Sequence, residues 1–481
     1  MSVAGPNGAA AVPRRSVMCV DRAGAVACAE ASRETSALNK RSSAHTNKCR
    51  DLDNGNKVYR TNCGVARILL VSWGSYGDIY PYVGLAIELK QRGHAAVLAT
   101  AEYYRPLIES LGFEFHPMGP MIEPADHALV ERVLDPVRGA DVLIKELLLP
   151  SLEADYAAPD HAAQQADVMV THPITFAGPI VAQARRLPWI STVLAPMSFF
   201  SATDAPVLAP APYLASLNRF GSWYGRVMRR FARAGTVHWM KPVFDLRRQL
   251  GLQAGGHPLF EGQFSPTLTL ALFSRVLASP QPDWPPNVVV TGSVFYNGPE
   301  VLQPSLEQFL DAGPPPVVFT LGSSAVAAAG RFYEESLEAA RCLRARVVLL
   351  TGGFERNLPR DANSADTFVV DRAPHQLLFP RATAVVHPGG AGTLAQALRA
   401  GHPMLVVPHA HDQPDNAARA ARLGVGRTIR RQRYRAANVA RELEQMLSDR
   451  RIHAQAEEVA AIVRSEGGAA AAAAAIDALA Q

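Results

Sequence analysis

Residues 384–416 hold the groups best suited to chemistry, because a glycine turn and a polar run follow two apolar stretches there. The turn contains three glycines, Gly389, Gly390 and Gly392. It separates a strand expected over Ala384–Val386 from a helix expected over Thr393–Ala400. Such a turn lets backbone N–H groups approach a ligand and directs the positive end of the helix towards it. We therefore expect an anion site here, for phosphate.

Polar side chains on either side of this turn extend the expected site. His387 precedes the turn and could donate a hydrogen bond to a phosphate oxygen, although a lone histidine is more often structural. The run His409–Asn416 leaves the next strand, Met404–Val407, at the same edge of the sheet. Within it, Asp412 and Gln413 suit the hydroxyl groups of a sugar. The local chemistry thus suggests a phosphate joined to a sugar.

A second glycine loop, Gly74–Asp78, lies near the start of the ordered chain. It follows the apolar run Ala66–Trp73, which is typical of a central parallel strand. Asp78 could project from the end of this strand and act as a general base. It could equally be the N-cap of a helix expected over Tyr82–Arg92, with Pro81 at its start. The residues alone leave both interpretations open.

Two further segments should reach the same edge as the glycine turn. Thr320–Ser324 ends a strand with two hydroxyls, Ser323 and Ser324, that could hold phosphate oxygens, although a plain turn is as consistent. Another segment follows the strand expected over Thr367–Val370, and its proline and backbone amides could contact a nucleobase. It comprises Arg372, Ala373, Pro374, His375 and Gln376.

The elements that must position these groups alternate between strand and helix. Further strands are expected over Ala95–Thr100, Val168–Thr171, Trp189–Leu194, Val288–Thr291, Val317–Leu321 and Arg346–Thr351. Helices are expected over Ala177–Arg186 and Tyr333–Leu343. This alternation predicts an α/β protein with two doubly wound, Rossmann-like domains, whose glycine loops face one cleft.

The expected domain limits follow from shifts in composition. We expect a first domain over 66–295 and a second over 317–465, joined by a proline-rich linker over 296–316. The tail, 466–481, is alanine-rich and predicts a helix packed on the surface. Residues 1–65 lack hydrophobic periodicity, so we expect a disordered basic extension.

Bulk composition excludes several classes of protein. Of the 48 Lys and Arg and 43 Asp and Glu, residues 1–65 hold ten and five, so the remaining chain has 38 of each. A folded body without net charge does not attract nucleic acid. Only Cys342 lies beyond the extension, which excludes a disulfide framework and favours a reducing, cytoplasmic compartment. The sequence contains no run of 18 consecutive apolar residues, so we expect no transmembrane helix.

Two less regular stretches remain in the first domain. Met197–Pro212 follows a strand and is a candidate acceptor loop, with Met197 and Phe199 as candidate contacts. Asn218–Met240 contains an amphipathic helix, which either packs on the domain or meets a membrane surface that delivers a lipid-like acceptor. Its apolar residues are Phe220, Trp223, Tyr224, Val227 and Phe231, and its basic ones are Arg219, Arg226, Arg230 and Arg233.

Two of these blocks carry a family resemblance. GSYGDIYPYVGLAIELKQRGH at 74–94 resembles the opening motif of bacterial and sterol-type family 1 glycosyltransferases. HPGGAGTLAQALRAGHPMLVVPHAHDQPDNAARAARLGVG at 387–426 resembles their nucleotide-sugar signature. QPDWPPNVVVTG at 281–292 and the H-D-Q-x-D-N form at 411–416 look like those of the rhamnosyltransferases of rhamnolipid synthesis. The resemblance covers about residues 66–462.

The resemblance implies a GT-B fold with the acceptor bound by the N-terminal domain and the donor by the C-terminal domain. It implies inverting, metal-independent transfer from a UDP- or dTDP-sugar, without a cofactor, to a hydroxyl of a small hydrophobic or lipid-like acceptor. The leaving diphosphate would be stabilised by the helix start and the loop N–H groups. The alternatives are a non-catalytic nucleotide-sugar-binding subunit and a nucleotide-sugar epimerase of similar fold.

The resemblance also implies roles for single residues. Asp78 matches the aspartate proposed as general base, and Ser75 and Tyr76 beside it would contact the acceptor. Arg372 stands where plant members have a tryptophan that stacks on uracil, which leaves UDP and dTDP both open. The diphosphate site would comprise His387, Gly389, Gly390, Gly392 and Thr393, with Ser323 and Ser324 beside it. Asp412 and Gln413 would contact the sugar, and residues 372–376 the base.

Overall fold

The computed structural model describes residues 65–122, 126–298 and 301–480. The described residues belong to one compact unit. The expected basic extension, 1–65, therefore lies outside the described residues except for Val65.

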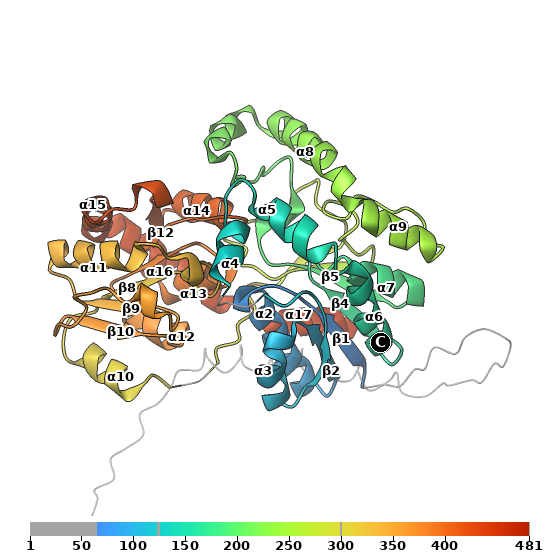
Figure 1. Ribbon diagram of the computed structural model, residues 1–481, viewed down its shortest axis with the longest axis horizontal. Helices are drawn as coiled ribbons and strands as arrows, with labels where there is room; N and C mark the ends of the chain where they lie inside the picture. The colour runs from blue at the N-terminus through green and yellow to red at the C-terminus, as the bar shows by residue number, and fades with distance from the viewer. Residues whose placement is uncertain (1–64, 123–125, 299–300, 481) are drawn as a thin grey trace, which may run out of the picture. The chain divides into compact units, whose positions relative to one another are not determined.

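The first half of the folded unit is built on a seven-stranded parallel sheet with the order β3-β2-β1-β4-β5-β6-β7 (Figure 1). Its strands are β1 Arg67–Val71, β2 Ala95–Thr100, β3 Glu114–Pro117, β4 Val168–Thr171, β5 Trp189–Val193, β6 Leu268–Ala271 and β7 Val288–Val290. The chain order reverses between β1 and β4. Open α/β sheets bind ligands beyond the carboxyl ends of the strands at such a switch point.

The second half repeats this plan with a six-stranded parallel sheet in the order β10-β9-β8-β11-β12-β13. Its strands are β8 Val317–Thr320, β9 Val347–Leu350, β10 Thr367–Val370, β11 Ala384–His387, β12 Met404–Val406 and β13 Gly426–Thr428. Here the order reverses between β8 and β11. The expected pair of doubly wound α/β domains is confirmed.

The strands form where the chain is continuously apolar, because helices cover both faces of each sheet. In β1 the residues Ile68–Val71 are wholly buried. The helices of the first half are α2 Tyr76–Gln91, α3 Arg105–Ser110, α4 His127–Val133, α5 Gly139–Asp141, α6 Leu152–Ala163, α7 Ala177–Arg185, α8 Ser222–Thr236 and α9 Lys241–Gln249. Those that follow are α10 Pro304–Asp311, α11 Phe332–Leu343, α12 His375–Leu378, α13 Ala391–Ala400, α14 Gln413–Arg422, α15 Ala436–Ser448, α16 Arg450–Ser465 and α17 Gly468–Ala480.

Several boundaries differ from the expected ones. The helix α2 begins at Tyr76 rather than Tyr82, so Pro81 lies inside it. The linker expected over 296–316 contains α10, whose apolar face packs into the core of the second half. The strands β3, β6 and β13 were not predicted, because each is short and its sequence carries no long apolar run.

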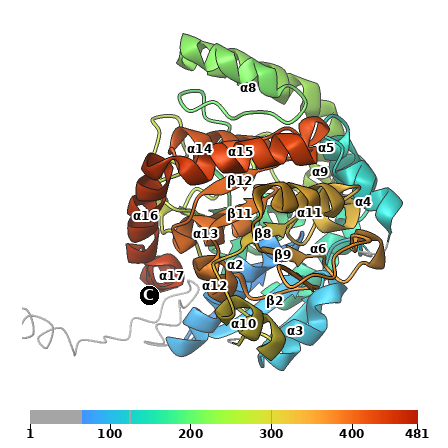
Figure 2. The same ribbon diagram turned by 90° about the vertical axis from the view of Figure 1, so that its left-hand side faces the viewer.

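The alanine-rich tail forms the expected helix, α17, but this helix is partly buried rather than lying on the surface. Helix α16 runs beside α13, and the chain then crosses back so that α17 packs on α2 of the first half (Figure 2). Ala472, Ala473 and Ile476 are wholly buried in the first core. The crossing point is held by Glu466, whose Oε1 accepts hydrogen bonds from Ser274 Oγ and the Arg275 N–H, each at 2.9 Å.

By length and composition alone, the helical stretch Arg450–Leu479 is apolar enough to cross a membrane, and it is the one such stretch among the described residues. In the structure it consists of α16 and α17, which are interrupted at Glu466. Both helices pack on other elements of the fold. We therefore interpret the apolar residues of this stretch as contacts that pack the two helices within the fold.

Candidate active site

Asp78 lies at the start of α2, directly after the switch-point strand β1. Ser75 is the N-cap, and its Oγ accepts a hydrogen bond from the Gly77 N–H at 3.3 Å. Asp78 Oδ2 accepts hydrogen bonds from the Ser75 N–H at 2.7 Å and from Ser75 Oγ at 3.0 Å. This capping box explains the early helix start. It occupies Oδ2, while Oδ1 faces away from the cap.

The other oxygen of Asp78 faces His172, which follows β4 on the opposite side of the switch point. His172 Nε2 lies 3.4 Å from Asp78 Oδ1. The His172 Nδ1 accepts a hydrogen bond from the Ile174 N–H at 3.4 Å, so the ring proton belongs on Nε2. The two strand ends of the first sheet thus place a histidine N–H against the carboxylate.

These contacts set the charge of Asp78. Burial raises the pKa of its carboxyl, but the hydrogen bond and charge of His172 and the hydrogen bonds from Ser75 outweigh burial and hold the pKa below its usual value. Asp78 is therefore ionised at neutral pH. An ionised carboxylate beyond a strand end can accept a proton from a bound hydroxyl.

The glycine turn of the second half has the geometry of an anion site. It joins β11 to α13, and the N-cap Gly390 provides no side chain to cap the first N–H groups of that ten-residue helix. Gly389 has φ +88°, and a Cβ there would lie 2.8 Å from Val406 Cγ1. A Cβ on Gly390 would meet nothing within 4 Å. The turn therefore leaves open space in front of uncapped N–H groups.

His387 has a different environment from the one expected of a phosphate ligand. It is wholly buried at the end of β11, and its Nδ1 accepts a hydrogen bond from the Gly389 N–H at 3.1 Å. Its Nε2 lies 3.5 Å from the sulfur of Met404. Burial and the charge of His375 lower its pKa to about 3. The neutral ring shapes the turn in this structure and offers no free donor to a phosphate oxygen.

The end of β8 meets the start of α13, as the strand order requires. Gly322 has φ +64°, and a Cβ there would lie 3.2 Å from Thr393 Oγ1. Ser323 is exposed and Ser324 half-buried in the loop that follows. The structure therefore brings the two serines beside the helix start that carries Thr393. Their contact with phosphate stays a prediction.

The two glycine loops meet directly. A Cβ on Gly392 would lie 3.3 Å from the Cα atom of Gly77, and one on Gly77 would lie 3.9 Å from the Gly392 nitrogen. His411, which follows β12, also reaches the first half, because a Cβ on Gly139 would lie 3.5 Å from its Cε1. Residues about 300 positions apart in the chain thus form one site.

Asp412 lies close enough to Asp78 for the two carboxyl groups to interact electrostatically. Burial and the negative charge of Asp78 raise the pKa of Asp412 to about 7. Its Oδ2 accepts a hydrogen bond from Asn416 Nδ2 at 2.8 Å. Gln413 is buried, and its Oε1 accepts the N–H groups of His409 and Ala410 at 2.8 and 3.3 Å. Only its amide nitrogen remains available for a sugar.

The segment expected to bind the nucleobase also touches the first half. Arg372 is exposed, and its guanidinium carbon lies 5.3 Å from the ring centre of Tyr76. Its Nη1 lies 3.5 Å from the Tyr76 hydroxyl. Tyr76 itself packs against the rings of Tyr80 and Tyr104 at 5.0 and 5.2 Å. His375, three residues further, stacks on Phe379, and Ala373, Pro374 and Gln376 are half-buried around it.

The candidate acceptor loop is held by the Q-P-D-W segment. Asp283 accepts hydrogen bonds from the Ala202 N–H at 2.5 Å and from Ser201 Oγ at 2.7 Å. Trp284 stacks on Phe199 at 4.0 Å between ring centres. Phe199 is a buried core residue, and its contact with an acceptor stays a prediction. Met197 is half-buried and remains a candidate.

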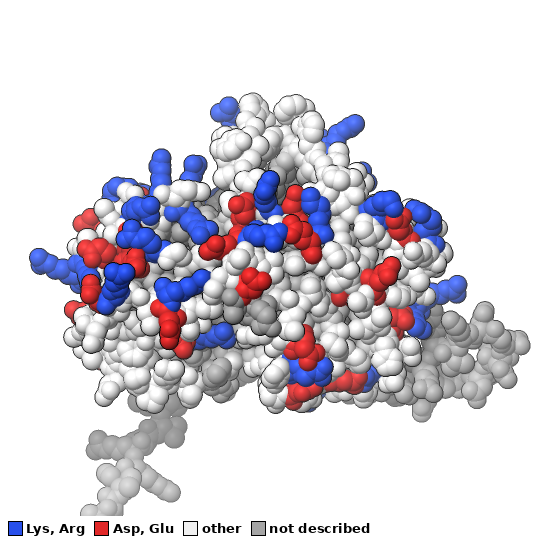
Figure 3. All heavy atoms as spheres, in the orientation of Figure 1, with Lys and Arg blue, Asp and Glu red and all other residues white. Residues whose placement is uncertain are grey.

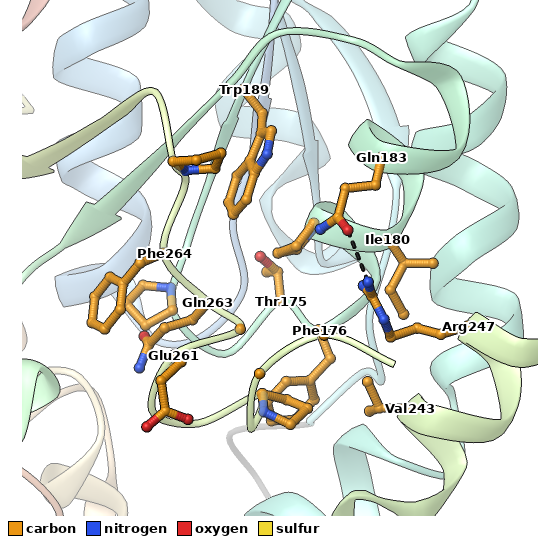
Figure 4. Close-up of a pocket in the computed structure, with 17 residues that line it drawn as sticks. Thr175, Phe176, Ile180, Gln183, Trp189, Val243, Arg247, Glu261, Gln263 and Phe264 are labelled. Carbon is orange, nitrogen blue, oxygen red and sulfur yellow. Dashed lines mark hydrogen bonds between the residues drawn. The ribbon is translucent and has the colours of Figure 1, made fainter. Parts of the chain in front are cut away.

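A cavity of about 310 Å³ lies in the first half between α7, α9 and the loop before β6 (Figure 4). Its wall begins with Pro173 and Thr175, which follow His172, and Thr175 Oγ1 donates to the His172 carbonyl at 2.7 Å. Arg247 and Gln183 form a polar pair in the wall, 2.8 Å apart. The apolar lining includes Phe176, Ile180, Trp189, Val243 and Phe264. A small hydrophobic molecule matches these walls.

Sequence reasoning missed two histidines of the site. His172 stands in T-H-P after a strand, and a histidine at the carboxyl end of a switch-point strand was a usable signal. His411 stands inside a polar run that was singled out only for Asp412 and Gln413. Neither can be paired with Asp78 without the strand order. Within the described ranges, no group of three or more His, Cys, Asp or Glu is arranged to hold a metal ion.

Two family models match the chain in succession. The model described as the glycosyltransferase family 28 N-terminal domain matches residues 68–145. The model described as the erythromycin biosynthesis protein CIII-like C-terminal domain matches residues 349–479. They fall on the two halves that carry the two glycine loops.

Curated relatives match most of the chain. The O-mycaminosyltylonolide 6-deoxyallosyltransferase of Streptomyces fradiae is 33% identical over 378 residues, which cover 74% of this chain and 84% of that protein. The vancomycin aglycone glucosyltransferase of Amycolatopsis orientalis is 29% identical over 430 residues, covering 86% and 98%. A sterol 3-beta-glucosyltransferase of Arabidopsis thaliana is 30% identical over 385 residues, covering 75% and 57%.

Solved structures agree with the fold. CalG4, the calicheamicin glycosyltransferase, superposes with a TM-score of 0.63 at 19% identity, covering 86% of this chain and 98% of that one. The glycosyltransferase VinC, solved in complex with DTDP, superposes with a TM-score of 0.62 at 20% identity, covering 86% and 99%.

Proposed function

The chain belongs to the family 1 glycosyltransferases of GT-B fold, and on this premise we propose that it transfers a sugar, with inversion, from a nucleotide diphosphate to an acceptor hydroxyl. The observation that carries the proposal is the meeting of the two glycine loops at Gly77 and Gly392. It brings the carboxylate of Asp78 to the helix start that suits a diphosphate. Because the family consists of glycosyltransferases, a non-catalytic subunit and an epimerase are set aside.

The proposed reaction divides its parts between the halves. Asp78 takes the proton of the acceptor hydroxyl while that oxygen forms a bond to the anomeric carbon. The bond from this carbon to the diphosphate oxygen breaks, and its electron pair leaves with the nucleotide diphosphate. His172 keeps Asp78 ionised and oriented. Attack from the face opposite the leaving group inverts the anomeric centre.

The charge that develops on the leaving diphosphate can be stabilised by protein groups. The uncapped N–H groups of α13 and the positive end of its dipole point into the open space at Gly390. Thr393 lies beside Gly322, and we propose its hydroxyl and those of Ser323 and Ser324 as further donors. We infer transfer without a metal ion, since these donors are fixed before the reaction begins.

The substrates can be proposed only as classes. VinC, of similar fold, was solved with DTDP, and Arg372 offers a cation rather than an indole at the nucleobase segment, so we propose a dTDP- or UDP-linked donor. The relatives named above act on macrolide, glycopeptide and sterol acceptors. The apolar cavity of the first half supports a small hydrophobic acceptor, and we propose a cytoplasmic enzyme.

Replacing Asp78 tests the assignment of the base. The change Asp78→Asn should lower kcat by at least about 10²-fold and, at a pH above the Asp412 pKa of about 7, leave donor affinity unchanged, because only proton transfer is lost. Donor affinity is measured by thermal shift with a panel that includes UDP-glucose and dTDP-rhamnose. Turnover is measured with excess chelator as well, which should have no effect.

The matched control is Ser75→Ala, which removes the cap hydroxyl but keeps the carboxylate. It should lower the melting temperature and preserve most turnover. Near-normal turnover of the Asp78→Asn enzyme would sink the base assignment, and loss of activity with chelator would overturn the metal-free mechanism.

A further inference from the structure

The segment between residues 212 and 237 exposes several large apolar side chains. It consists of a short helix, Pro212–Phe220, and α8, which lies at the top of Figure 1. We call its exposed residues the ridge: Tyr213 is 67% exposed, Phe220 53%, Trp223 62%, Phe231 74% and Val237 47%. Scattered apolar residues are normal on a surface, but a contiguous set marks an interaction site.

The helix α8 faces the protein with its small residues. Gly225 and Met228 are its buried residues. A Cβ on Gly225 would lie 2.1 Å from the Ala202 carbonyl oxygen, so the helix backbone rests directly on the acceptor loop. Trp223 and Phe231 therefore point outwards. The amphipathic helix therefore packs on the domain, as one of the two expectations for it stated, although Trp223 and Phe231 stay exposed.

The segment that carries the ridge has basic residues but no acidic ones. Between Asp204 and Asp245 the chain has six basic residues and no acidic one. Arg229 and Arg233 pair with Glu261, at 3.4 and 3.2 Å. Figure 3 shows white and blue atoms, without red, over α8 at the top of the view.

Two further arginines of α8, next to the ridge, are available to a partner. Arg226 and Arg230 are exposed, and Arg226 bonds only Ser222 Oγ, at 3.0 Å. Neither has an acidic partner among the residues that the structure describes. Residues 66–481 hold 38 basic and 38 acidic residues, so acidic residues elsewhere in the chain balance the six basic ones of this stretch, and the positive excess is local to it.

We propose that the ridge binds the surface of a membrane that contains anionic lipids. Tryptophan, phenylalanine and tyrosine are the side chains that enter the boundary between headgroups and acyl chains. Arginine binds lipid phosphates and is attracted by the negative surface potential. The combination of exposed aromatic rings with unpaired arginines, on a body of zero net charge, fits a lipid surface better than a nucleic acid or a basic protein.

The ridge lies close to the cavity proposed for the acceptor, and the inference that follows from this position rests on the proposed function. Glu261 lines the apolar cavity and is also the partner of Arg229 and Arg233 on α8. A docked ridge would hold the cavity next to the bilayer. The acceptor class is then an amphiphile that partitions into the membrane.

The test is sedimentation of the full chain with vesicles of phosphatidylcholine alone or with added phosphatidylglycerol. The chain should sediment with the anionic vesicles, and salt should weaken the binding. Arg226→Gln with Arg230→Gln should weaken it by roughly 30-fold, since each basic residue contributes about fivefold near the surface. Trp223→Ser with Phe231→Ser should weaken it at least as much. All four positions are exposed, so the melting temperature should not change.

The matched control is Leu358→Ser with Arg360→Gln, two exposed residues of the second half, which should bind vesicles normally. Donor hydrolysis should be unchanged in the ridge variants, and Asp78→Asn should bind vesicles normally, so failure of the membrane contact and failure of the catalytic assignment are distinguishable. Unchanged vesicle binding by both ridge variants would overturn the proposal. So would a ridge-dependent dimer in sedimentation velocity without vesicle binding, because the occupant would then be a second copy.

Discussion

Asp78 and Asp412 are two carboxyls whose environments drive their pKa values apart. Asp78 has a histidine and two cap donors, which keep its pKa low despite burial. Burial of the Asp412 carboxyl and the negative charge of Asp78 raise the pKa of Asp412 to about 7. Paired groups separated in this way can take different roles at one pH. Asp78 is ionised and suits a base, whereas Asp412 changes its charge near neutrality.

We predict that donor affinity rises with pH through about 7. Below this pH Asp412 is protonated, and above it the carboxylate can accept hydrogen bonds from two sugar hydroxyls. In the free protein the sign is opposite, because a folded pKa above the unfolded one lowers stability as pH rises through it. Donor dissociation constants and melting temperatures between pH 5.5 and 8.5, roughly the span of this titration, provide the measurement.

Two variants control this prediction. Asp412→Asn should abolish the step in donor affinity. Asp78→Asn removes the neighbouring negative charge, so the step should move to lower pH. A step that survives in the Asp412→Asn protein belongs to another group.

At the residue scale, the sequence predicted the identity of the important side chains better than their partners. Asp78 was interpreted either as a helix cap or as a base, and the structure shows a carboxylate that serves the cap with Oδ2 and faces His172 with Oδ1. The expected phosphate contact of His387 was reasonable from the motif, but local sequence cannot show that a ring is wholly buried. Burial depends on neighbours such as Met404 that are distant in the chain.

At the scale of elements, the glycine turn before α13 is built from residues with different constraints. Gly389 needs glycine for its own conformation, at φ +88° and against Val406. Gly390 has φ −60° and open space around it. The second position is therefore free of demands from the fold, and a ligand is the remaining reason for a small residue there.

These two glycines give a matched pair of alanine variants. Gly389→Ala should destabilise the protein by about 1–3 kcal/mol, from the left-handed backbone and the clash. Gly390→Ala should leave the melting temperature unchanged but weaken donor binding at least about tenfold, because its methyl group enters the proposed diphosphate space. Thermal melting with and without donor measures both. Unaltered donor binding by Gly390→Ala would place the diphosphate elsewhere.

The sequence predicted the long elements well and their ends less well. Continuous apolar runs identified β1, β2, β4 and β10, since buried parallel strands need such residues. The start of α2 was misplaced because Pro81 suggested a first turn, whereas the capping box at Ser75 begins the helix earlier. Short strands such as β13 form only because neighbouring strands offer hydrogen bonds, which local composition does not reveal.

At the scale of the whole molecule, a buried ion network joins the donor and acceptor segments. Arg419 on α14 bonds Asp415 Oδ2 through Nε at 2.7 Å, and Asp204 Oδ2 and the Leu277 carbonyl through Nη1 at 2.5 and 3.0 Å. Asp415 Oδ1 accepts the Val207 N–H at 3.0 Å. The helix that begins with the proposed sugar contacts therefore holds the end of the loop proposed for the acceptor.

We predict that Arg419→Lys raises the acceptor KM more than the donor dissociation constant. Lysine keeps the charge but cannot reach both carboxylates and the carbonyl with one planar group. Arg419→Ala should cost about 3–5 kcal/mol of stability, because the buried carboxylate of Asp415 and the half-buried one of Asp204 would lose this cation. Kinetics at varied acceptor concentration and thermal melting provide the measurements.

Arg422 supplies the control on the same helix. It lies 3.6 Å from the same Asp204, but its side chain is 60% exposed. Exposed ion pairs contribute little, so Arg422→Ala should change neither stability nor the acceptor KM appreciably. Equal effects of the Arg419 and Arg422 variants would argue against a specific coupling of the two segments.

The return of α17 to the first half has a consequence for synthesis. Domains generally fold from the N-terminus as the chain leaves the ribosome. Here Ala472, Ala473 and Ile476 fill the first core, so the first half stays incomplete until residues 472–476 have emerged. Both halves must then reach their native state almost together. A ribosome stalled before residue 472 has emerged would therefore hold a nascent chain with an open apolar groove along α2, the form that chaperones bind.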